Sequence, residues 1–231
     1  MTTIYLIRHG QASFGAASYD LLSARGEQQA VVVGEFLQRI LPDMPYVEAG
    51  SMQRHQQTAQ GALQGWPNSV VHTEPGWNEF DHQQVLSCYD PRFNHPELLK
   101  QDMANYSSPR AYLAEIFEAA IARWTDAQHD QDYTETWPQF QQRVQQAMQQ
   151  LCTCLTQQQP RYAVVFSSGG VIANLIGQLL GLDAQHTFRL NWAIANASVT
   201  SLRWQEGKLE LLSINEHHFL KAHDPQLLTW I

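Results

Sequence analysis

The chain begins with a short buried-strand pattern, TIYLIRHG, from Thr3 to Gly10. Its first five residues are β-branched, aliphatic or aromatic, and they stop at Arg8, His9 and Gly10. A continuous apolar run that ends at a glycine turn is typical of a strand in the middle of a sheet. The sequence therefore predicts a first strand over Thr3 to Ile7, with Arg8 and His9 at its carboxyl end.

Strand and helix patterns alternate after this point. Ser23 is an N-cap candidate for a helix that Pro42 ends. Further strands are predicted over Tyr46–Gly50, Ser69–Thr73 and Tyr162–Phe166, and further helices from Arg54, over Pro138–Thr156 and over Val171–Gly181. The segments ASVTSLRW and KLELLSIN, which Gln205–Gly207 separate, predict a hairpin. This order favours a three-layer α/β/α sandwich whose mostly parallel sheet has an antiparallel edge.

The stretch from about Gln83 to Tyr133 interrupts this alternation with Pro, Asn and Ser residues. One amphipathic helix is predicted inside it, from Pro109 to about Trp124, with Ser108 as its cap. We interpret the stretch as an insert, or lid, that covers the carboxyl edge of the sheet. No linker divides the chain, so residues 1–231 are expected to form one domain.

Composition excludes several classes of function. The chain has 231 residues and a net charge of −8, which argues against broad nucleic-acid binding but permits an anionic substrate. No apolar run is as long as a membrane span, so no membrane partner is expected. The odd, sparse cysteines Cys88, Cys152 and Cys154 are typical of a reducing compartment, and a cytoplasmic location is the expectation.

Chemically versatile side chains follow the predicted strands. Arg8 and His9 follow the first, Arg54 follows the second, Glu79 follows the third, and Ser167 to Gly170 follow the fourth. Because the carboxyl ends of parallel strands meet at one edge, these groups are expected to converge there. Each alone has a simpler reading, since a strand-end histidine is usually structural and a helical arginine is usually a surface charge. Their conjunction indicates a phosphoryl-transfer site.

The residue types suit that chemistry. A guanidinium can donate two hydrogen bonds at once to phosphoryl oxygens, and a neutral imidazole can attack phosphorus. A buried, protonated glutamate can donate to the leaving oxygen. The helix that begins at Gly169–Gly170 can present backbone N–H groups to an anion.

Several ordered blocks then resemble the histidine phosphatase (phosphoglycerate mutase-like) superfamily. IYLIRHGQAS and DLLSARGEQQA are similar to its opening strand, RHG and first helix, and SMQRHQQTA to its S-x-x-x-R-x-x-Q-T-A segment. WNEFDH, ETWPQFQQRV, VVFSSGGVIANLIG and NASVTSL resemble later segments of the family in the same order. Together the blocks span residues 3 to about 202.

The resemblance implies a role for each matching residue. His9 is the nucleophile that becomes phosphohistidine, and Glu79 is the proton donor, with Glu74 a less favoured choice. Phosphate is bound by the side chains or backbone of Arg8, Arg54, Ser168 and Gly169. Supporting roles are implied for Gly10, Ser13, Ser51 and Asn196. His82 is a further supporting candidate because it lies three residues past Glu79, and it does not come from the resemblance.

Position 168 departs from the family pattern, which has a second histidine where this chain has Ser168. A serine supplies one uncharged donor, and losing a preorganised donor costs on the order of 10² to 10³ in rate. Either Ser168 and the helix N-terminus suffice, or another histidine fills the gap, or the protein only binds phosphorylated ligands. His82 is the first candidate for that histidine, and His55, His217 and His218 are weaker ones.

The resulting expectation is an atypical acid phosphatase. It would hydrolyse a small phosphorylated metabolite or phosphopeptide, without a cofactor or metal. A non-catalytic phospholigand-binding protein is the alternative, and a phosphoglycerate mutase is less favoured because extra basic residues are missing. His217, His218 and His223 do not suggest a zinc set, since adjacent histidines on a strand point to opposite faces. The substrate and the oligomeric state stay open.

Overall fold

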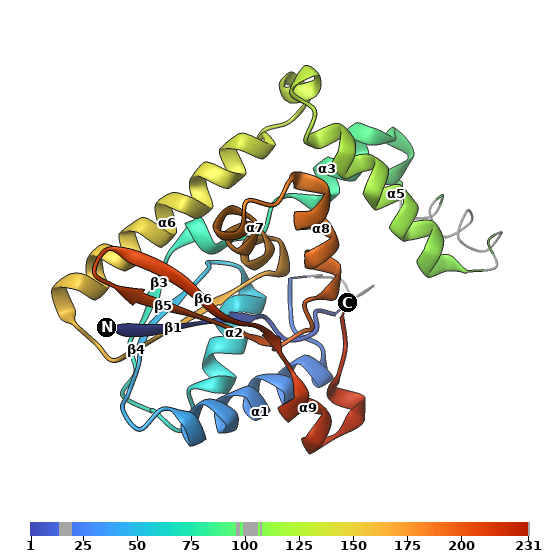
Figure 1. The fold of residues 1–231 in the computed structure, drawn as a ribbon. Coiled ribbons are helices and arrows are strands. Elements are labelled where there is room, and N and C mark those ends of the chain that lie inside the picture. The colour runs from blue at the N-terminus through green and yellow to red at the C-terminus, as the bar shows by residue number, and fades with distance from the viewer. Residues whose placement is uncertain (14–19, 96–97, 99–105, 107, 231) are drawn as a thin grey trace.

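A twisted sheet in the strand order β3-β2-β4-β1-β5-β6 forms the middle layer (Figure 1). The computed structural model describes residues 1–13, 20–95, 98, 106 and 108–230. Strands β3, β2, β4 and β1 are parallel, whereas β5 runs antiparallel to β1 and pairs with β6 in a hairpin. The strands are β1 Thr2–Arg8, β2 Tyr46–Ala49, β3 Val71–Thr73, β4 Tyr162–Ser167, β5 Val199–Gln205 and β6 Lys208–Glu216. The predicted mostly parallel sheet with an antiparallel edge is confirmed.

The register brings the carboxyl ends of the parallel strands to one level. Arg8 lies opposite Ser167, and Ala49 lies opposite both Phe166 and Thr73. The residues that follow these strands therefore share one edge of the sheet, which is where ligands bind in open α/β sheets.

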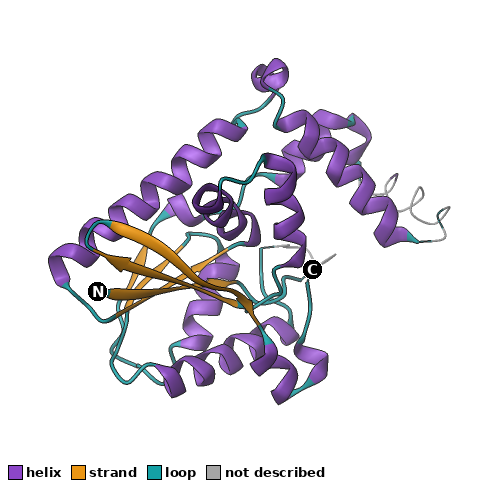
Figure 2. Cartoon of the chain, in the orientation of Figure 1, coloured by secondary structure: helices purple, strands orange, loops and turns teal. Residues whose placement is uncertain are grey.

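Helices cover both faces of the sheet (Figure 2). Side chains alternate along β1, so that Ile4 and Leu6 enter one apolar core and Ile7 enters the other. The first core lies under α6 Trp137–Gln158, α7 Gly169–Leu180 and α8 Ala184–Ala193, and the second lies under α1 Ala24–Ile40, α2 Gln53–Ala62 and α9 His218–His223. These are the three layers that the sequence predicts.

The described part of the insert is helical. It contains α3 His82–Tyr89 and α5 Pro109–Trp124, together with the short turns η2 Pro91–Asn94 and η3 Ala127–Asp132. Trp124 at the end of α5 stacks on Phe80 at 4.8 Å and meets Trp137 of α6 edge-on at 5.4 Å. The insert is thus anchored on the α6–α8 side of the sheet, above and to the right of α7 and α8 in Figure 1. Part of it, including residues 99–105, lies outside the described residues.

The helix ends follow local sequence signals. The Ser23 side chain accepts a hydrogen bond from the Gly26 N–H and caps α1, as predicted. Gly181 closes α7 in the left-handed region, at a φ of 65°. The capping box of Thr136 and Gln139 starts α6 at Trp137, one residue before the predicted start. None of the described helices is long and apolar enough to cross a membrane.

One expectation about the C-terminal histidines is wrong. His217 and His218 do not continue a strand, because β6 ends at Glu216 after Asn215 adopts a φ of 56°. His217 is the N-cap of α9, and its ring stacks on that of His218 at 4.9 Å instead of pointing to the opposite face. Helices α3, α8 and α9 were not predicted either.

Candidate active site

His9 lies on a turn whose backbone is held on three sides. Its N–H donates to the Ser167 carbonyl at 2.8 Å, and its own carbonyl accepts from the Ala197 N–H at 3.2 Å. The following Gly10 N–H donates to Thr58 Oγ1 at 3.1 Å. A Cβ on Gly10 would overlap the Gly26 carbonyl, so only glycine lets α1 pack this closely. The turn therefore fixes His9, which is 7% exposed, at the carboxyl edge of β1.

The His9 ring is held in the tautomer that a nucleophile needs. Its Nδ1 lies 2.7 Å from the Gly10 carbonyl oxygen. Because a carbonyl can only accept, Nδ1 carries the proton and Nε2 keeps a lone pair. Burial, followed by the charges of Arg54 and Arg8, holds the pKa of His9 well below its ordinary value. His9 is therefore neutral near pH 7, with Nε2 available.

Two guanidinium groups supply the positive charge. Arg54, in the first turn of α2, is 5% exposed, and its Nη1 pairs with Asp20 at 2.7 Å. Arg8 Nη1 donates to the backbone carbonyls of Ile194 at 2.5 Å and Trp230 at 2.9 Å. Both charges act on the pKa of His9 and on that of Glu79. The arrangement is a positively charged edge built from two separate strand ends.

Glu79 accepts a hydrogen bond from the start of α7. The sequence predicted that the backbone donors there would face an anion. The Gly170 N–H donates to Glu79 Oε2 at 3.0 Å, and a Cβ on Gly170 would overlap Oε1. Burial raises the pKa of Glu79, although this hydrogen bond and the charges of Arg54 and Arg8 oppose the shift. A buried carboxyl with a raised pKa is suited to proton donation.

Glu74, the other acidic residue considered from sequence, has a local partner. Its Oε1 accepts from the Gly76 N–H at 2.7 Å and so caps the short turn η1 Pro75–Trp77. This contact gives Glu74 a structural role in the loop that leads to Glu79.

Ser168 is fully buried and lies at the N-cap of α7, but its side chain makes no capping hydrogen bond. Its Oγ lies 2.7 Å from Nε2 of His55, a residue in the first turn of α2. The His55 ring is in turn 5.7 Å from the His9 ring, between centroids. Of the histidines considered from sequence, His55 is thus the one in direct contact with Ser168. His82, at the start of α3, lies close enough for the charge of Arg54 to lower its pKa, after burial.

The supporting residues mostly hold loops together. The Ser51 N–H and Oγ both bond the side-chain amide of Asn78 at 2.8 Å, which ties the start of α2 to the Glu79 loop. The Asn196 amide lies 3.4 Å from the His9 carbonyl, whereas the Ser13 hydroxyl donates to the Leu22 carbonyl at 2.9 Å. Gly169 has no room for a side chain, since a Cβ there would overlap the Asn191 amide oxygen.

The sequence assigned no role to three residues that contact this edge, Asp20, Thr58 and Asn78. It named His55 only as a weaker candidate than His82, although His55 is the partner of Ser168. The signal that could have indicated Asn78 is its position directly before Glu79. Asp20 and Thr58 lie within the blocks DLLSARGEQQA and SMQRHQQTA. Their contacts do not follow from these patterns, because each acts on a residue of another element.

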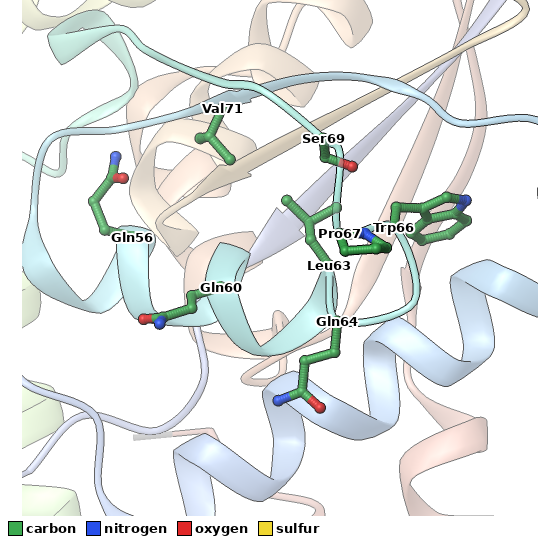
Figure 3. A pocket seen from close by; sticks show the side chains of 8 residues that line it. All are labelled: Gln56, Gln60, Leu63, Gln64, Trp66, Pro67, Ser69 and Val71. Carbon is green, nitrogen blue, oxygen red and sulfur yellow. The ribbon is translucent and has the colours of Figure 1, made fainter.

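A hollow of about 520 Å³ lies between α2 and the segment that leads to β3 (Figure 3), and none of the residues of the site lines it. It is lined by Gln56, Gln60, Leu63, Gln64, Trp66, Pro67, Ser69 and Val71, none of which is charged. It therefore lacks the groups that phosphoryl chemistry needs. Within the part of the chain that the structure describes, no three His, Cys, Asp or Glu side chains gather as a metal site.

Comparison with known proteins adds an independent finding. The family model of the histidine phosphatase superfamily (branch 1) matches residues 4–92 and 90–217. No curated protein is significantly similar to the chain.

Three solved structures share the fold. The α-ribazole phosphatase from Shigella flexneri is 22% identical, with a TM-score of 0.61 and 93% of this chain and 96% of that chain covered. Phosphoglycerate mutase from Bacillus anthracis is 18% identical, with a TM-score of 0.63 and 95% of each chain covered. A mycobacterial glucosyl-3-phosphoglycerate phosphatase, in complex with inorganic phosphate, is 20% identical, with a TM-score of 0.59 and coverage of 95% and 99%.

Proposed function

The chain belongs to the histidine phosphatase superfamily, branch 1, and we propose that it hydrolyses phosphomonoesters through a phosphohistidine at His9. The observation that carries this proposal is the state of the His9 ring. The ring is neutral, its Nδ1 proton is bound to the Gly10 carbonyl, and its Nε2 lone pair is free beside the charges of Arg8 and Arg54. These are the properties of an activated nucleophile for an anionic phosphoryl group.

The first half of the reaction transfers the phosphoryl group to the protein. The guanidinium groups of Arg8 and Arg54 bind its oxygens, and the His9 Nε2 lone pair forms a bond to phosphorus. The bond from phosphorus to the ester oxygen breaks, and that oxygen takes the proton of Glu79, whose raised pKa keeps the proton available. The products of this step are the free alcohol and phospho-His9.

The second half returns the site to its starting state. A water oxygen attacks phosphorus, the Glu79 carboxylate takes the proton of that water, and the bond from phosphorus to Nε2 breaks. Inorganic phosphate leaves, and His9 keeps its Nδ1 proton on the Gly10 carbonyl throughout. The preorganised guanidinium charges lower both barriers, since the negative charge on phosphorus meets them in each transition state.

The proposed substrate is a small phosphorylated metabolite or a phosphopeptide. The net charge of −8 makes a polyanion such as nucleic acid an unsuitable ligand, while the local charge of Arg8 and Arg54 attracts one phosphate. Cys88, Cys152 and Cys154 are free thiols, which is compatible with a reducing, cytoplasmic environment.

Steady-state release of inorganic phosphate tests this proposal. We expect the purified chain to hydrolyse 4-nitrophenyl phosphate between pH 4 and 8. Among phosphoserine, sugar phosphates and a phosphopeptide, we expect it to prefer one class, seen as a higher kcat/KM. Isothermal calorimetry with inorganic phosphate is run in parallel. Phosphate binding without turnover of any of these esters would overturn the hydrolase proposal and support a phospholigand-binding protein.

A further inference from the structure

Two fully buried polar side chains, those of His55 and Ser168, are in contact and have no part in the reaction steps above. His55 Nε2, from the first turn of α2, lies 2.7 Å from Ser168 Oγ, at the junction of β4 and α7. Both residues are 0% exposed, and 113 residues separate them in sequence. Burying two polar groups costs free energy unless they are hydrogen-bonded, so this pair is a built feature of the site.

The Ser168 side chain does not cap α7, although serine at this position of a helix usually does. An N-cap serine normally accepts from the N–H of the second or third helical residue, but Ser168 makes no such bond. The Gly170 N–H, one of those donors, goes to Glu79 instead. The Ser168 hydroxyl is therefore left to His55 and to whatever lies in the site.

The surroundings of His55 decide which ring nitrogen carries its proton. Burial, and then the charge of Arg54, lower the pKa of His55 well below its ordinary value, so the ring is neutral and has one N–H. Nδ1 is buried and has no hydrogen-bond partner among the described residues, and it faces Gly50, where a Cβ would overlap it. An N–H at Nδ1 would be an orphaned buried donor, which proteins avoid. The proton therefore belongs on Nε2.

This tautomer determines what the serine does. With the proton on Nε2, His55 donates to Ser168 Oγ, so the hydroxyl proton of Ser168 has to donate elsewhere. Ser168 directly follows Ser167, whose carbonyl accepts from the His9 N–H at 2.8 Å, and the His55 ring lies 5.7 Å from the His9 ring. A phosphoryl group bound beside His9 would offer an oxygen that can accept this hydroxyl proton.

We propose that His55 is a positioning residue that fixes the Ser168 hydroxyl as a hydrogen-bond donor to the transferred phosphoryl group. This inference rests on the proposed function. Two residues from different elements then provide the donor at position 168, and the imidazole sits on α2 directly after Arg54. Gly50 belongs to the same arrangement, because its missing side chain leaves room for the His55 ring.

A mutant cycle with 4-nitrophenyl phosphate tests the coupling. We expect Ser168→Ala to lower kcat by about 10²-fold, since it removes one preorganised donor, with a smaller change in KM. His55→Leu is expected to lower kcat by at least about 10-fold, and the double variant is expected to be no slower than Ser168→Ala alone. His55→Gln, whose amide N–H can replace Nε2–H, should recover part of the loss. Gln60→Leu, on an exposed position of α2, is the matched control.

Nuclear magnetic resonance of the wild-type protein gives a readout that does not depend on activity or on variants that fail to fold. A two-bond ¹H–¹⁵N correlation spectrum should show a protonated Nε2 and a bare Nδ1 for His55. A protonated Nδ1, or additive losses in the mutant cycle, would overturn the inference. If the His55→Leu variant turns over substrate as fast as the wild type, only this inference is overturned. If the wild type itself shows no turnover, the proposed function is overturned.

Discussion

Replacing His9 by alanine is expected to lower kcat for 4-nitrophenyl phosphate by more than about 10⁴-fold, the scale typical of removing a covalent nucleophile. The physical reason is that Nε2 of His9 is the atom that bonds to phosphorus, and neither Arg8 nor Arg54 can replace its lone pair. The measurement is steady-state phosphate release with enough enzyme to detect the residual rate.

The control for this variant is His223→Ala, which removes an exposed histidine at the end of α9. Circular dichroism and thermal melting establish that His9→Ala still folds. Residual turnover within 10-fold of wild type would show that another group attacks phosphorus, and the assignment of His9 would be wrong.

The second large effect concerns Glu79. Glu79→Gln keeps the shape of the side chain but removes the transferable proton, and general acid catalysis contributes roughly 10² to 10⁴ in rate. We expect a loss of that size with an alkyl phosphate, whose alkoxide leaving group needs a proton. The loss should be much smaller with 4-nitrophenyl phosphate, whose phenolate leaves without one. The comparison of the two substrates separates proton donation from a general disturbance of the site.

Glu74→Gln provides the matched control, because Glu74 lies five residues before Glu79 and caps the turn that precedes it. This variant should keep the selectivity between alkyl and aryl phosphates that the wild type has. If Glu74→Gln instead abolishes alkyl phosphate hydrolysis and Glu79→Gln does not, the proton donor is Glu74.

The pKa shifts of His9 and Glu79 predict the shape of the pH profile. The rate should rise with pH as His9 loses its proton, and this limb lies at low pH because burial and two guanidinium charges lower the pKa of His9. It should fall again as Glu79 ionises, at a pH above the ordinary carboxyl range because burial raises its pKa. For alkyl phosphates, kcat/KM is therefore bell-shaped in the wild type, and the Glu79→Gln variant should lose the limb that Glu79 causes.

The framework of this fold is readable from the sequence because each parallel strand carries its own signal. The apolar runs before Arg8 and Ser167 are continuous, and such runs are typical of strands that are buried on both faces. Ser23 and Gly181 mark helix ends through local side-chain and backbone chemistry. The positions of the groups at the strand ends follow from topology once the strands are known to be parallel.

Helices α8 and α9 carry no comparable signal. Only Thr187 and Phe188 of α8 are buried, so its sequence shows no apolar stripe of helical period. Helix α9 has only six residues. The sequence itself does not mark the end of β6, which comes at Glu216, directly after Asn215 adopts a positive φ. Both helices are defined by the tertiary structure rather than by their own propensity.

The partner of Ser168 could not be derived from the sequence for a related reason. His55 has the ordinary sequence position of a helix residue, and its contact depends on how α2 and α7 meet across the sheet edge. Sequence reasoning favoured His82, which is close to Glu79 along the chain. The one available signal for His55 is that it directly follows Arg54 in the first turn of α2, where side chains reach the same edge.

A crystal structure with orthovanadate would show whether Nε2 of His9 attacks a phosphoryl group held by Arg8 and Arg54. Vanadate imitates the five-coordinate phosphorus of the transfer step. We expect a bond from vanadium to His9 Nε2, with the guanidinium groups of Arg8 and Arg54 and the Ser168 hydroxyl on the vanadate oxygens. Vanadate bound away from His9, or bonded through Nδ1, would contradict it.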